Sequence, residues 1–532
     1  MIYFIPAWYK AGSWSENEQA WHSRRQRTEF DDTVKHIQLF HRNQFYEYSI
    51  MLLGYTPNFR HFLHRQSMYH APYWSCFDAM QKIRGKRVMN FSYHDLAWPD
   101  GVEFVYSPFV VIAYLNGAKY AEIEFGEDGN MIEVTMFNGD ETIRKNIYDD
   151  RGFISSTIIY ENGQAVNQDF LMENGIWKLR VSLLDKTVSI NQDSSDYRIE
   201  YNGNEENISF SKLNYSSMEE VIREVTERYL FNTSRSDIFC IAMHERHVEM
   251  LGEILRNRKY ILSFYVDRYP IDKITEIRSQ IQHSSYVITD SRENMMSICD
   301  FNVYKDKYNI IDITPYDTRV DKGISQHLHV KKIMVPVDGL KAEQYNKIIG
   351  TLGKYLSDHD DTEISLFTRD SSYDIEDRIL GNTREILISM GYEPGWAEKD
   401  NERNFSENKL EYEETVEVKF RVEQCVDEID VTVCMRKQRI IMDLRPMPEL
   451  YLQVTAISIG VPQIVLNGNQ FIENGKNGFI IEDIDDAGEK ISYYLDNLSN
   501  WNEAVISSYE LGRKFTTQVL INRWKEVLNT IE

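Results

Sequence analysis

The chain has 532 residues, which is too many for a single hydrophobic core and predicts about two to four domains. Hydrophobic residues make up 42% of it and aromatic residues 13%, with only 12 prolines, so the composition is that of a globular protein and excludes a disordered one. The 83 acidic and 59 basic residues give a formal net charge of −24, which argues against nucleic acid as a partner because such a charge repels phosphate backbones.

The N-terminal residues Met1 to Lys10 are largely apolar, but no basic region precedes them and no small-residue cleavage site follows. They predict a buried first strand and not a signal peptide. The longest uncharged run, Phe104 to Ala118, contains Pro108 and is shorter than the roughly 20 apolar residues that span a bilayer. The 5 cysteines are scattered singly, as is typical of reduced thiols, so we expect a cytoplasmic protein.

The first hundred residues predict the opening of an α/β domain. A short strand over Ile2 to Ile5 is followed by a polar loop with Trp8 and Trp14, a helix near Glu29 to Arg42 and an apolar run over Tyr48 to Leu53.

From about Gly101 to Lys212 apolar and polar residues alternate, which is the period of a half-buried strand. Several Asn-Gly pairs separate these segments, and Asn-Gly supplies the positive φ angles that tight hairpins require. The region therefore predicts an inserted antiparallel sheet, whose exposed edges favour docking of another chain. The hairpin pairs are Asn138-Gly139, Asn162-Gly163, Asn174-Gly175 and Asn202-Gly203.

Helical periodicity resumes after Ser217, which stands three residues before Glu220 in a capping-box pattern. Strand-like segments then alternate with helical ones, at Ile238 to Met243, Ile261 to Val266 and Tyr286 to Thr289. This alternation predicts a parallel sheet with helices on both faces.

A second α/β unit is predicted to begin near residue 331, where the strand Lys332 to Val337 leads into an amphipathic helix. Its later strands are expected at Ile364 to Phe367, Ile429 to Met435, Ile440 to Leu444, Gln463 to Leu466 and Phe479 to Ile481.

The most informative segment of this unit runs from Asp443 to Ile481. A strand ends at Leu444, a loop with two prolines opens a helix at Pro448, and Gly460-Val461-Pro462 closes that helix into the next strand. This pattern resembles the donor-sugar half of GT-B glycosyltransferases, in which two acidic residues, separated by seven others, precede Gly-Val-Pro. The resemblance implies two Rossmann-like domains facing across a cleft, with a helix N-terminus toward the phosphates of a nucleotide sugar.

The two acidic positions of that pattern fall on Met447 and Thr455, so both carboxylates are absent. Glu449 stands two residues from the first position, but a shift of two residues rotates a helical side chain by about 200°. The comparison therefore predicts that the scaffold is kept and the chemistry is lost. The segment Arg513 to Lys525 resembles the GT-B terminal helix that crosses back to the first domain.

We therefore expect an α/β, GT-B-like fold with an inserted antiparallel β-sheet domain. Residues 1–100 and 213–330 would form the N-terminal Rossmann-like domain, 101–212 the insertion, 331–510 the C-terminal Rossmann-like domain and 511–532 the crossing helix.

Three further stretches resemble the first accessory secretory proteins of the streptococcal accessory Sec system: Met1 to Tyr9, Tyr73 to Asp78 and Val335 to Leu340. The resemblance runs over nearly the whole chain. It implies a cytosolic role in the export of glycosylated serine-rich repeat adhesins, with the adhesin, the second and third accessory secretory proteins and the accessory SecA motor as partners. Contact with the inner face of the cell membrane would then be peripheral, through the export complex.

His244 and His247 are spaced by three, not by the four of a zinc-binding helix, so we expect no metal there and no cofactor elsewhere. No GxSxG or GxxxxGK[ST] motif is present. His244 and Arg246 follow a strand end, where α/β folds place ligand loops. With Trp8, Trp14, Arg445 and Glu449 they are the candidate glycan-binding residues, although ordinary packing explains the two tryptophans equally well.

The leading interpretation is a non-catalytic GT-B-like subunit that binds glycan or glycoprotein and scaffolds an export complex. The alternative from the enzyme class is an active GT-B glycosyltransferase that modifies the adhesin. A third interpretation is an interaction subunit whose cleft is empty.

Overall fold

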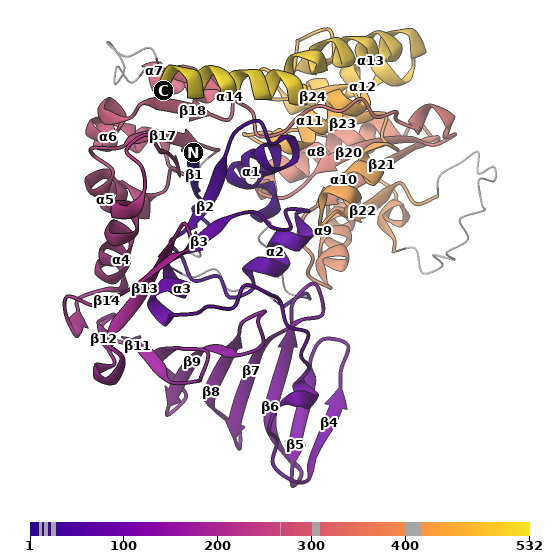
Figure 1. Cartoon of the computed structure of the whole chain (residues 1–532). Coiled ribbons are helices and arrows are strands. Elements are labelled where there is room, and N and C mark those ends of the chain that lie inside the picture. Colours follow the sequence, from indigo (N-terminus) through magenta and orange to yellow (C-terminus); the bar gives the residue numbers. More distant parts are fainter. Residues whose placement is uncertain are drawn as a thin grey trace.

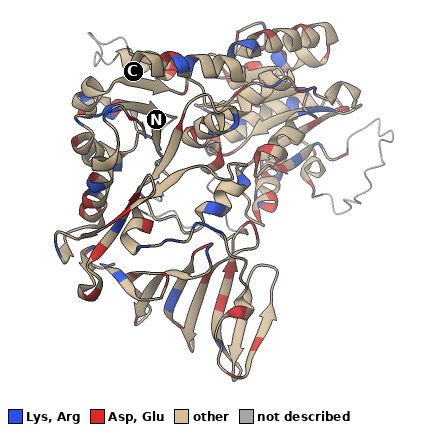
Figure 2. Ribbon diagram, viewed as in Figure 1, with Lys and Arg blue, Asp and Glu red and all other residues tan. Residues whose placement is uncertain are grey.

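A computed structural model shows three large sheets and describes residues 1–9, 13–14, 20–22, 28–266, 268–300, 309–399 and 417–531 (Figure 1). The basic stretch Arg24 to Arg27 and most of the acidic segment 398–414 lie outside these residues. Acidic and basic side chains are interspersed over the elements of all three sheets (Figure 2).

The N-terminal unit is built on a seven-stranded parallel sheet in the order β19-β18-β17-β16-β1-β2-β3. Its strands come from both sides of the antiparallel region, which therefore interrupts the unit. The strands are β1 (Ile2–Ile5), β2 (Tyr48–Leu52), β3 (Tyr73–Ser75), β16 (Ile238–Ala242), β17 (Lys259–Phe264), β18 (Tyr286–Thr289) and β19 (Ile310–Asp312). The helices are η1 (Thr28–Phe30), α1 (Asp32–Asn43), α2 (Phe59–Arg65), α3 (Cys76–Gln81), α4 (Met218–Asn232), α5 (Glu245–Ile254), α6 (Arg278–His283) and α7 (Arg292–Asp300).

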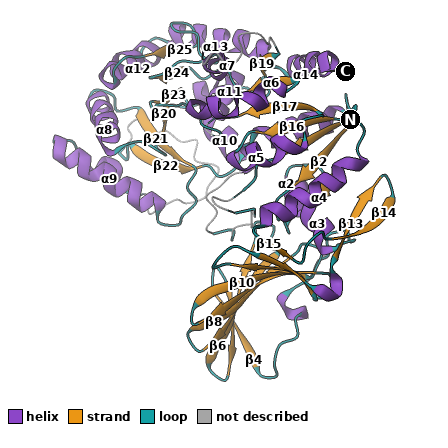
Figure 3. Ribbon diagram, turned by 90° about the vertical axis from the view of Figure 1, so that its left-hand side faces the viewer, coloured by secondary structure: helices purple, strands orange, loops and turns teal. Residues whose placement is uncertain are grey.

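The antiparallel region forms a ten-stranded sheet whose outer strands extend away from the two α/β units (Figure 3). Asn162 and Gly163, at the turn between β9 and β10, have φ angles of 52° and 74°, as a type I′ hairpin requires. The sheet order is β15-β12-β11-β10-β9-β8-β7-β6-β5-β4, and β13 and β14 pair as a separate hairpin. The strands are β4 (Val102–Tyr106), β5 (Val111–Leu115), β6 (Ala118–Phe125), β7 (Met131–Asn138), β8 (Glu141–Tyr148), β9 (Ile154–Glu161), β10 (Gln164–Leu171), β11 (Trp177–Ser182), β12 (Val188–Ile190), β13 (Asp196–Tyr201), β14 (Asn204–Ser209) and β15 (Asn214–Tyr215).

The C-terminal unit has a six-stranded parallel sheet in the order β22-β21-β20-β23-β24-β25. The strands are β20 (Lys331–Pro336), β21 (Thr362–Thr368), β22 (Phe420–Gln424), β23 (Ile440–Asp443), β24 (Gln463–Val465) and β25 (Gly478–Ile480). The helices are α8 (Ala342–Leu356), α9 (Ile375–Met390), α10 (Glu428–Met435), α11 (Leu450–Ile459), α12 (Ala487–Leu495), α13 (Leu498–Gly512) and α14 (Thr517–Ile531).

The expected strand at Ile429 to Met435 is wrong, because the structure has helix α10 there. Its β-branched residues favour a strand. However, the Asp427 carboxylate accepts hydrogen bonds from the backbone N–H groups of Ile429 and Asp430, which caps a helix. Only one side of α10 is buried, and Ile429 is 73% exposed on the other.

Helix α14 packs on the N-terminal unit, although it follows the whole C-terminal unit in sequence (Figure 1). The fully buried ring of Trp524 contacts the rings of Phe4 and Phe40 edge-on, at centroid distances of 5.9 and 5.1 Å. The exact boundaries of the four predicted segments remain a proposal. The strand order supports them, because the N-terminal sheet takes strands from both sides of the inserted sheet. No helix within the described residues is long and apolar enough to cross a membrane.

Candidate functional site

The two α/β units meet at the aromatic ring of Phe30. The guanidinium carbon of Arg369, just after β21, lies 3.9 Å from the ring centroid, and the Tyr451 ring packs against it at 4.9 Å. The Phe30 carbonyl accepts hydrogen bonds from the hydroxyls of Tyr265 and Tyr316. Phe30 thus fixes η1, directly before α1, against the C-terminal unit.

Glu449, at the N-terminus of α11, is held by two arginines. Nε of Arg369 donates to Glu449 Oε1 at 2.9 Å, and Nη2 of Arg445 lies 3.7 Å from Oε2. Asp443, at the end of β23, accepts a hydrogen bond from the Glu449 N–H at 3.1 Å. The Glu449 carboxylate is therefore neutralised by groups of the protein itself.

Arg445 is similarly engaged, because its Nε and Nη2 donate to the two carboxylate oxygens of Asp443 at 2.8 and 2.6 Å. Burial acts to lower the pKa of Arg445, but the bonds to Asp443 outweigh it and raise that pKa. Arg445 thus orders the turn that leads into α11.

The two positions of the missing acidic pair differ in their surroundings. Met447 is 51% exposed in the loop before α11. Thr455 is buried in α11, and its hydroxyl donates to the Tyr451 carbonyl at 2.7 Å, within the same helix. Neither residue carries a group that could accept a charge-assisted hydrogen bond from a ribose or a sugar.

Trp14, His244 and Arg246 come together around Tyr9, beyond the carboxyl ends of β1 and β16. The Tyr9 ring lies 5.0 Å from Trp14 and 5.5 Å from His244, and the Arg246 guanidinium lies 5.2 Å above Trp14. His244 begins α5, where Nδ1 accepts the Arg246 N–H at 3.2 Å. Trp14 is only 7% exposed, so its ring is covered by protein.

His247, on the first turn of α5, supports this cluster. Burial lowers its pKa to about 3, so the ring is neutral. Nδ1 lies 2.6 Å from the Ala242 carbonyl and must carry the proton, which leaves Nε2 to accept from the Tyr9 hydroxyl at 3.0 Å. Across the described residues, no group of three or more His, Cys, Asp or Glu side chains is arranged to hold a metal ion.

Trp8 lies apart from this cluster. Its ring packs on Phe62 at a centroid distance of 5.2 Å, and its indole N–H donates to Asp31 at 3.1 Å. Asp31 also binds Arg268 at 2.8 Å. Trp8 is 7% exposed and helps to anchor the start of α1.

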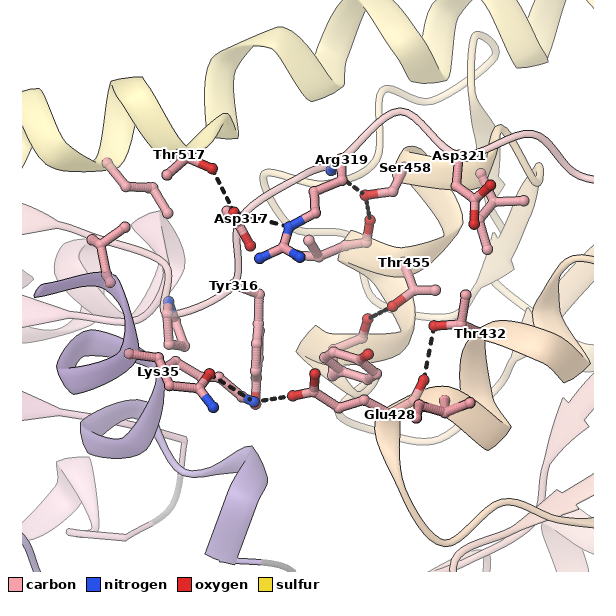
Figure 4. Close-up of a pocket in the computed structure, with 18 of the residues that line it drawn as sticks. Lys35, Tyr316, Asp317, Arg319, Asp321, Glu428, Thr432, Thr455, Ser458 and Thr517 are labelled. Carbon is pink, nitrogen blue, oxygen red and sulfur yellow. Dashed lines mark hydrogen bonds and ion pairs between the residues drawn. The ribbon is translucent and has the colours of Figure 1, made fainter. Parts of the chain in front are cut away.

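A groove of about 740 Å³ opens between the units, beside the Phe30 contact (Figure 4). Helix α1, the 315–321 connection, α10, α11 and α14 line it. Lys35 of α1 forms an ion pair across it with Glu428 of α10, and Asp317 binds Thr517 and Arg319. Thr455 also faces this groove, so one of the two positions that align with the acidic pair of the GT-B pattern lies on its wall.

Four residues that make contacts between the units were not predicted from the sequence: Phe30, Arg369, Lys35 and Glu428. No motif marks them. In a parallel sheet, the loops and helices that follow the strands converge at one edge of the sheet. This rule could have identified the elements that carry Lys35 and Arg369, but not the residues themselves.

The chain matches, over residues 1–531, the family model of the Accessory Sec system protein that is also called accessory secretory protein 1. A relative of this family from Streptococcus gordonii is 30% identical over 99% of both chains. Among solved structures, the complex of accessory secretory proteins 1, 2 and 3 from Streptococcus pneumoniae contains a chain that is 27% identical, with a TM-score of 0.81 over 100% of this chain and 99% of that one.

The fold alone is shared with the pneumococcal O-GlcNAc transferase solved with UDP and GlcNAc, which is 13% identical, with a TM-score of 0.70 over 100% of this chain and 98% of that one. The expected GT-B-like architecture is thereby confirmed. The match of the family model over residues 1–531 and the relative at 30% identity show that this chain belongs to the family of accessory secretory protein 1 of the accessory Sec system.

Proposed function

We propose that this accessory Sec subunit does not transfer sugar, and that it binds glycan or glycoprotein and scaffolds the export of glycosylated serine-rich repeat adhesins. The observation that carries the proposal is the donor site. Met447 and Thr455 stand where the GT-B pattern has carboxylates, while Glu449 is already paired with Arg369.

Each missing carboxylate removes charge-assisted hydrogen bonds that contribute about 1.5–3 kcal/mol to donor binding. We therefore expect no detectable binding of UDP-sugars to the full chain in calorimetric titration. Release of UDP from a UDP-sugar, in the presence of unglycosylated adhesin repeats, would refute the non-catalytic assignment.

The glycan would be held between His244 and Arg246 on one unit and the Arg445 to Glu449 turn on the other. The Arg246 side chain stacks on Trp14 and forms no ion pair within the described part of the chain, which supports its availability as a donor. A few such hydrogen bonds support binding of a single sugar at about millimolar strength, or roughly −4 kcal/mol. A heavily glycosylated repeat would bind more tightly through avidity.

The test compares glycosylated and unglycosylated adhesin repeats with the wild-type protein and with Arg246→Ala. We expect binding of the glycosylated form alone, and its loss in the variant. The control is Lys476→Ala, which removes an exposed cation that pairs with Glu473 and is not part of the proposed glycan site. Equal binding of both repeats would refute glycan recognition.

The partners follow from the same assignment. Accessory secretory proteins 1, 2 and 3 form a complex in Streptococcus pneumoniae, and we propose the equivalent second and third proteins as partners of this chain. The accessory SecA motor and the adhesin complete the proposed set, and the chain would act in the cytoplasm with peripheral membrane contact through the complex. Co-purification from cells that express all components tests each contact in turn.

A further inference from the structure

A cavity of about 1320 Å³ runs along the outer edge of the seven-stranded sheet, away from the contact between the two α/β units. Strand β3, the last strand of that sheet, forms one wall, and the segment 83–88 and the β13–β14 hairpin form the other. Figure 1 shows the β13–β14 hairpin near β3. Nothing in the proposed glycan site uses this cavity.

The edge of β3 is open toward the cavity. Among the described strands, β3 pairs only with β2, where the Ile50 N–H donates to the Pro72 carbonyl at 2.8 Å. Successive residues of a strand direct their backbone groups to opposite edges. The N–H and C=O of Tyr73 therefore face the cavity, and an added strand could bond to both.

The opposite rim of the cavity is basic, which is unusual in a chain with a net charge of −24. Arg84, Lys86 and Arg87 stand within four residues and are exposed. Arg84 and Lys86 reach glutamates of the β13–β14 hairpin at 3.4 and 2.8 Å. Arg87 forms no hydrogen bond or ion pair within the described residues, so its charge is available to a ligand.

The floor of the cavity is aromatic. The rings of Trp74 and Tyr229 stack at a centroid distance of 4.1 Å, and Tyr201 meets Tyr229 edge-on at 6.0 Å. The hydroxyl of Tyr3 lies near these tyrosines, is buried and forms no hydrogen bond of normal geometry within the described structure. The floor therefore offers an apolar, aromatic surface to the side chains of a ligand.

We propose that this cavity is a docking site for an extended, acidic segment of a partner protein, which adds as a strand to the open edge of β3. Backbone hydrogen bonds to Tyr73 set the register, and the alternate side chains of the segment face opposite walls. Acidic side chains would meet Arg84, Lys86 and Arg87, and apolar ones would lie on the aromatic floor.

The first experiment titrates the full chain with a fluorescent eight-residue peptide in which glutamate alternates with valine. We expect saturable binding that weakens as salt is added, because the charged contacts are exposed. The same peptide with lysine in place of glutamate should not bind. A version with N-methyl groups on the backbone amides along one edge tests strand addition, since it keeps the side chains and removes the donors.

The second experiment uses the triple variant Arg84→Gln, Lys86→Gln and Arg87→Gln. It should weaken peptide binding by about tenfold or more, because three charges meet the acidic segment. The matched control neutralises three other exposed cations that each contact a surface carboxylate, with Arg319→Gln, Lys476→Gln and Lys514→Gln. The control should leave binding unchanged.

Two outcomes would overturn the proposal. One is absence of binding by the glutamate–valine peptide. The other is equal binding by its lysine or N-methyl versions, which would indicate an adsorbed peptide without strand pairing. Glycan binding, measured on the same triple variant, should stay at the wild-type level. Arg246→Ala should abolish glycan binding and leave peptide docking intact, so the two proposals can fail separately.

Discussion

His36 illustrates how one buried side chain couples the C-terminal helix to the N-terminal unit. The indole N–H of Trp524 donates to its Nδ1 at 3.3 Å. Burial lowers the pKa of His36 to about 4, an effect that nearby Arg268 reinforces and Asp32 opposes. The ring is therefore neutral at physiological pH, as an acceptor for Trp524 must be.

This pKa predicts acid sensitivity. An unfolded histidine titrates near pH 6.5, so between about pH 6.5 and 4 the unfolded chain binds the proton and the native one does not. Stability attributable to His36 is present above that range and falls as the pH falls through it, by about 2 kcal/mol between pH 7.5 and 5. Urea unfolding of wild type and His36→Gln, at both pH values, measures the difference. Identical pH dependence in the two proteins would contradict the assignment.

At the scale of the element, α10 shows local capping overriding β propensity. Asp427→Ala should destabilise α10 by about 1 kcal/mol, because two N–H groups at the start of the helix lose their acceptor. Asp427→Asn, which keeps an acceptor oxygen, should lose much less. Hydrogen exchange of the α10 amides reports the change, and equal exchange in both variants would argue that the cap is unimportant.

Most elements of the two parallel sheets could be predicted from the sequence, since apolar runs such as Tyr286–Thr289 are buried on both faces. Residues 429–435 could not, because the decisive group, Asp427, precedes the apolar pattern. Trp8 and Trp14 have the residue type of a sugar platform, but their burial depends on Phe62 and Tyr9, whose positions only the folded chain sets. The contact between Phe30 and Arg369 joins residues 339 apart and has no local signal.

At the scale of the whole molecule, the inserted sheet is not uniformly attached. Its inner strands share one core with α3, α4 and the N-terminal sheet, to which Leu179 and Phe170 belong. The outer strands have their own cluster, with Ile123 and Val134 at its centre. The two ends of the sheet should therefore differ in how strongly they affect the N-terminal unit.

Leu179→Ala should destabilise the N-terminal unit by about 2–5 kcal/mol, because it leaves a cavity in the shared core. Amide exchange should become faster in α4 and β16. Ile123→Ala is a matched truncation of a fully buried residue, and its effect should stay within the outer strands. If both substitutions made amide exchange faster in the same elements, the insertion would unfold together with the N-terminal unit.

The contact at Phe30 predicts how the two α/β units move. Phe30→Ala removes the ring from Arg369 and Tyr451. Other contacts across the boundary remain, among them the Lys35–Glu428 ion pair, the bond from the Arg292 N–H to Gln470 and the packing of the Tyr316 ring on Tyr451 at 5.1 Å. We expect a more open molecule, seen as a larger radius of gyration in X-ray scattering. Phe59→Ala, within the N-terminal unit, should lower stability without this expansion.

The packing of α14 has a consequence for synthesis on the ribosome. Strand β1 is translated long before α14, yet its side chains Ile2 and Phe4 share a cluster with Trp524 and Leu528, made more than 500 residues later. At roughly 5–20 residues per second, translation takes about half a minute to two minutes. Throughout that time the part of the N-terminal unit already made exposes apolar side chains that α14 covers in the folded protein. Nascent chains should therefore depend on a chaperone until α14 emerges, and should acquire protease resistance abruptly, in a single late step.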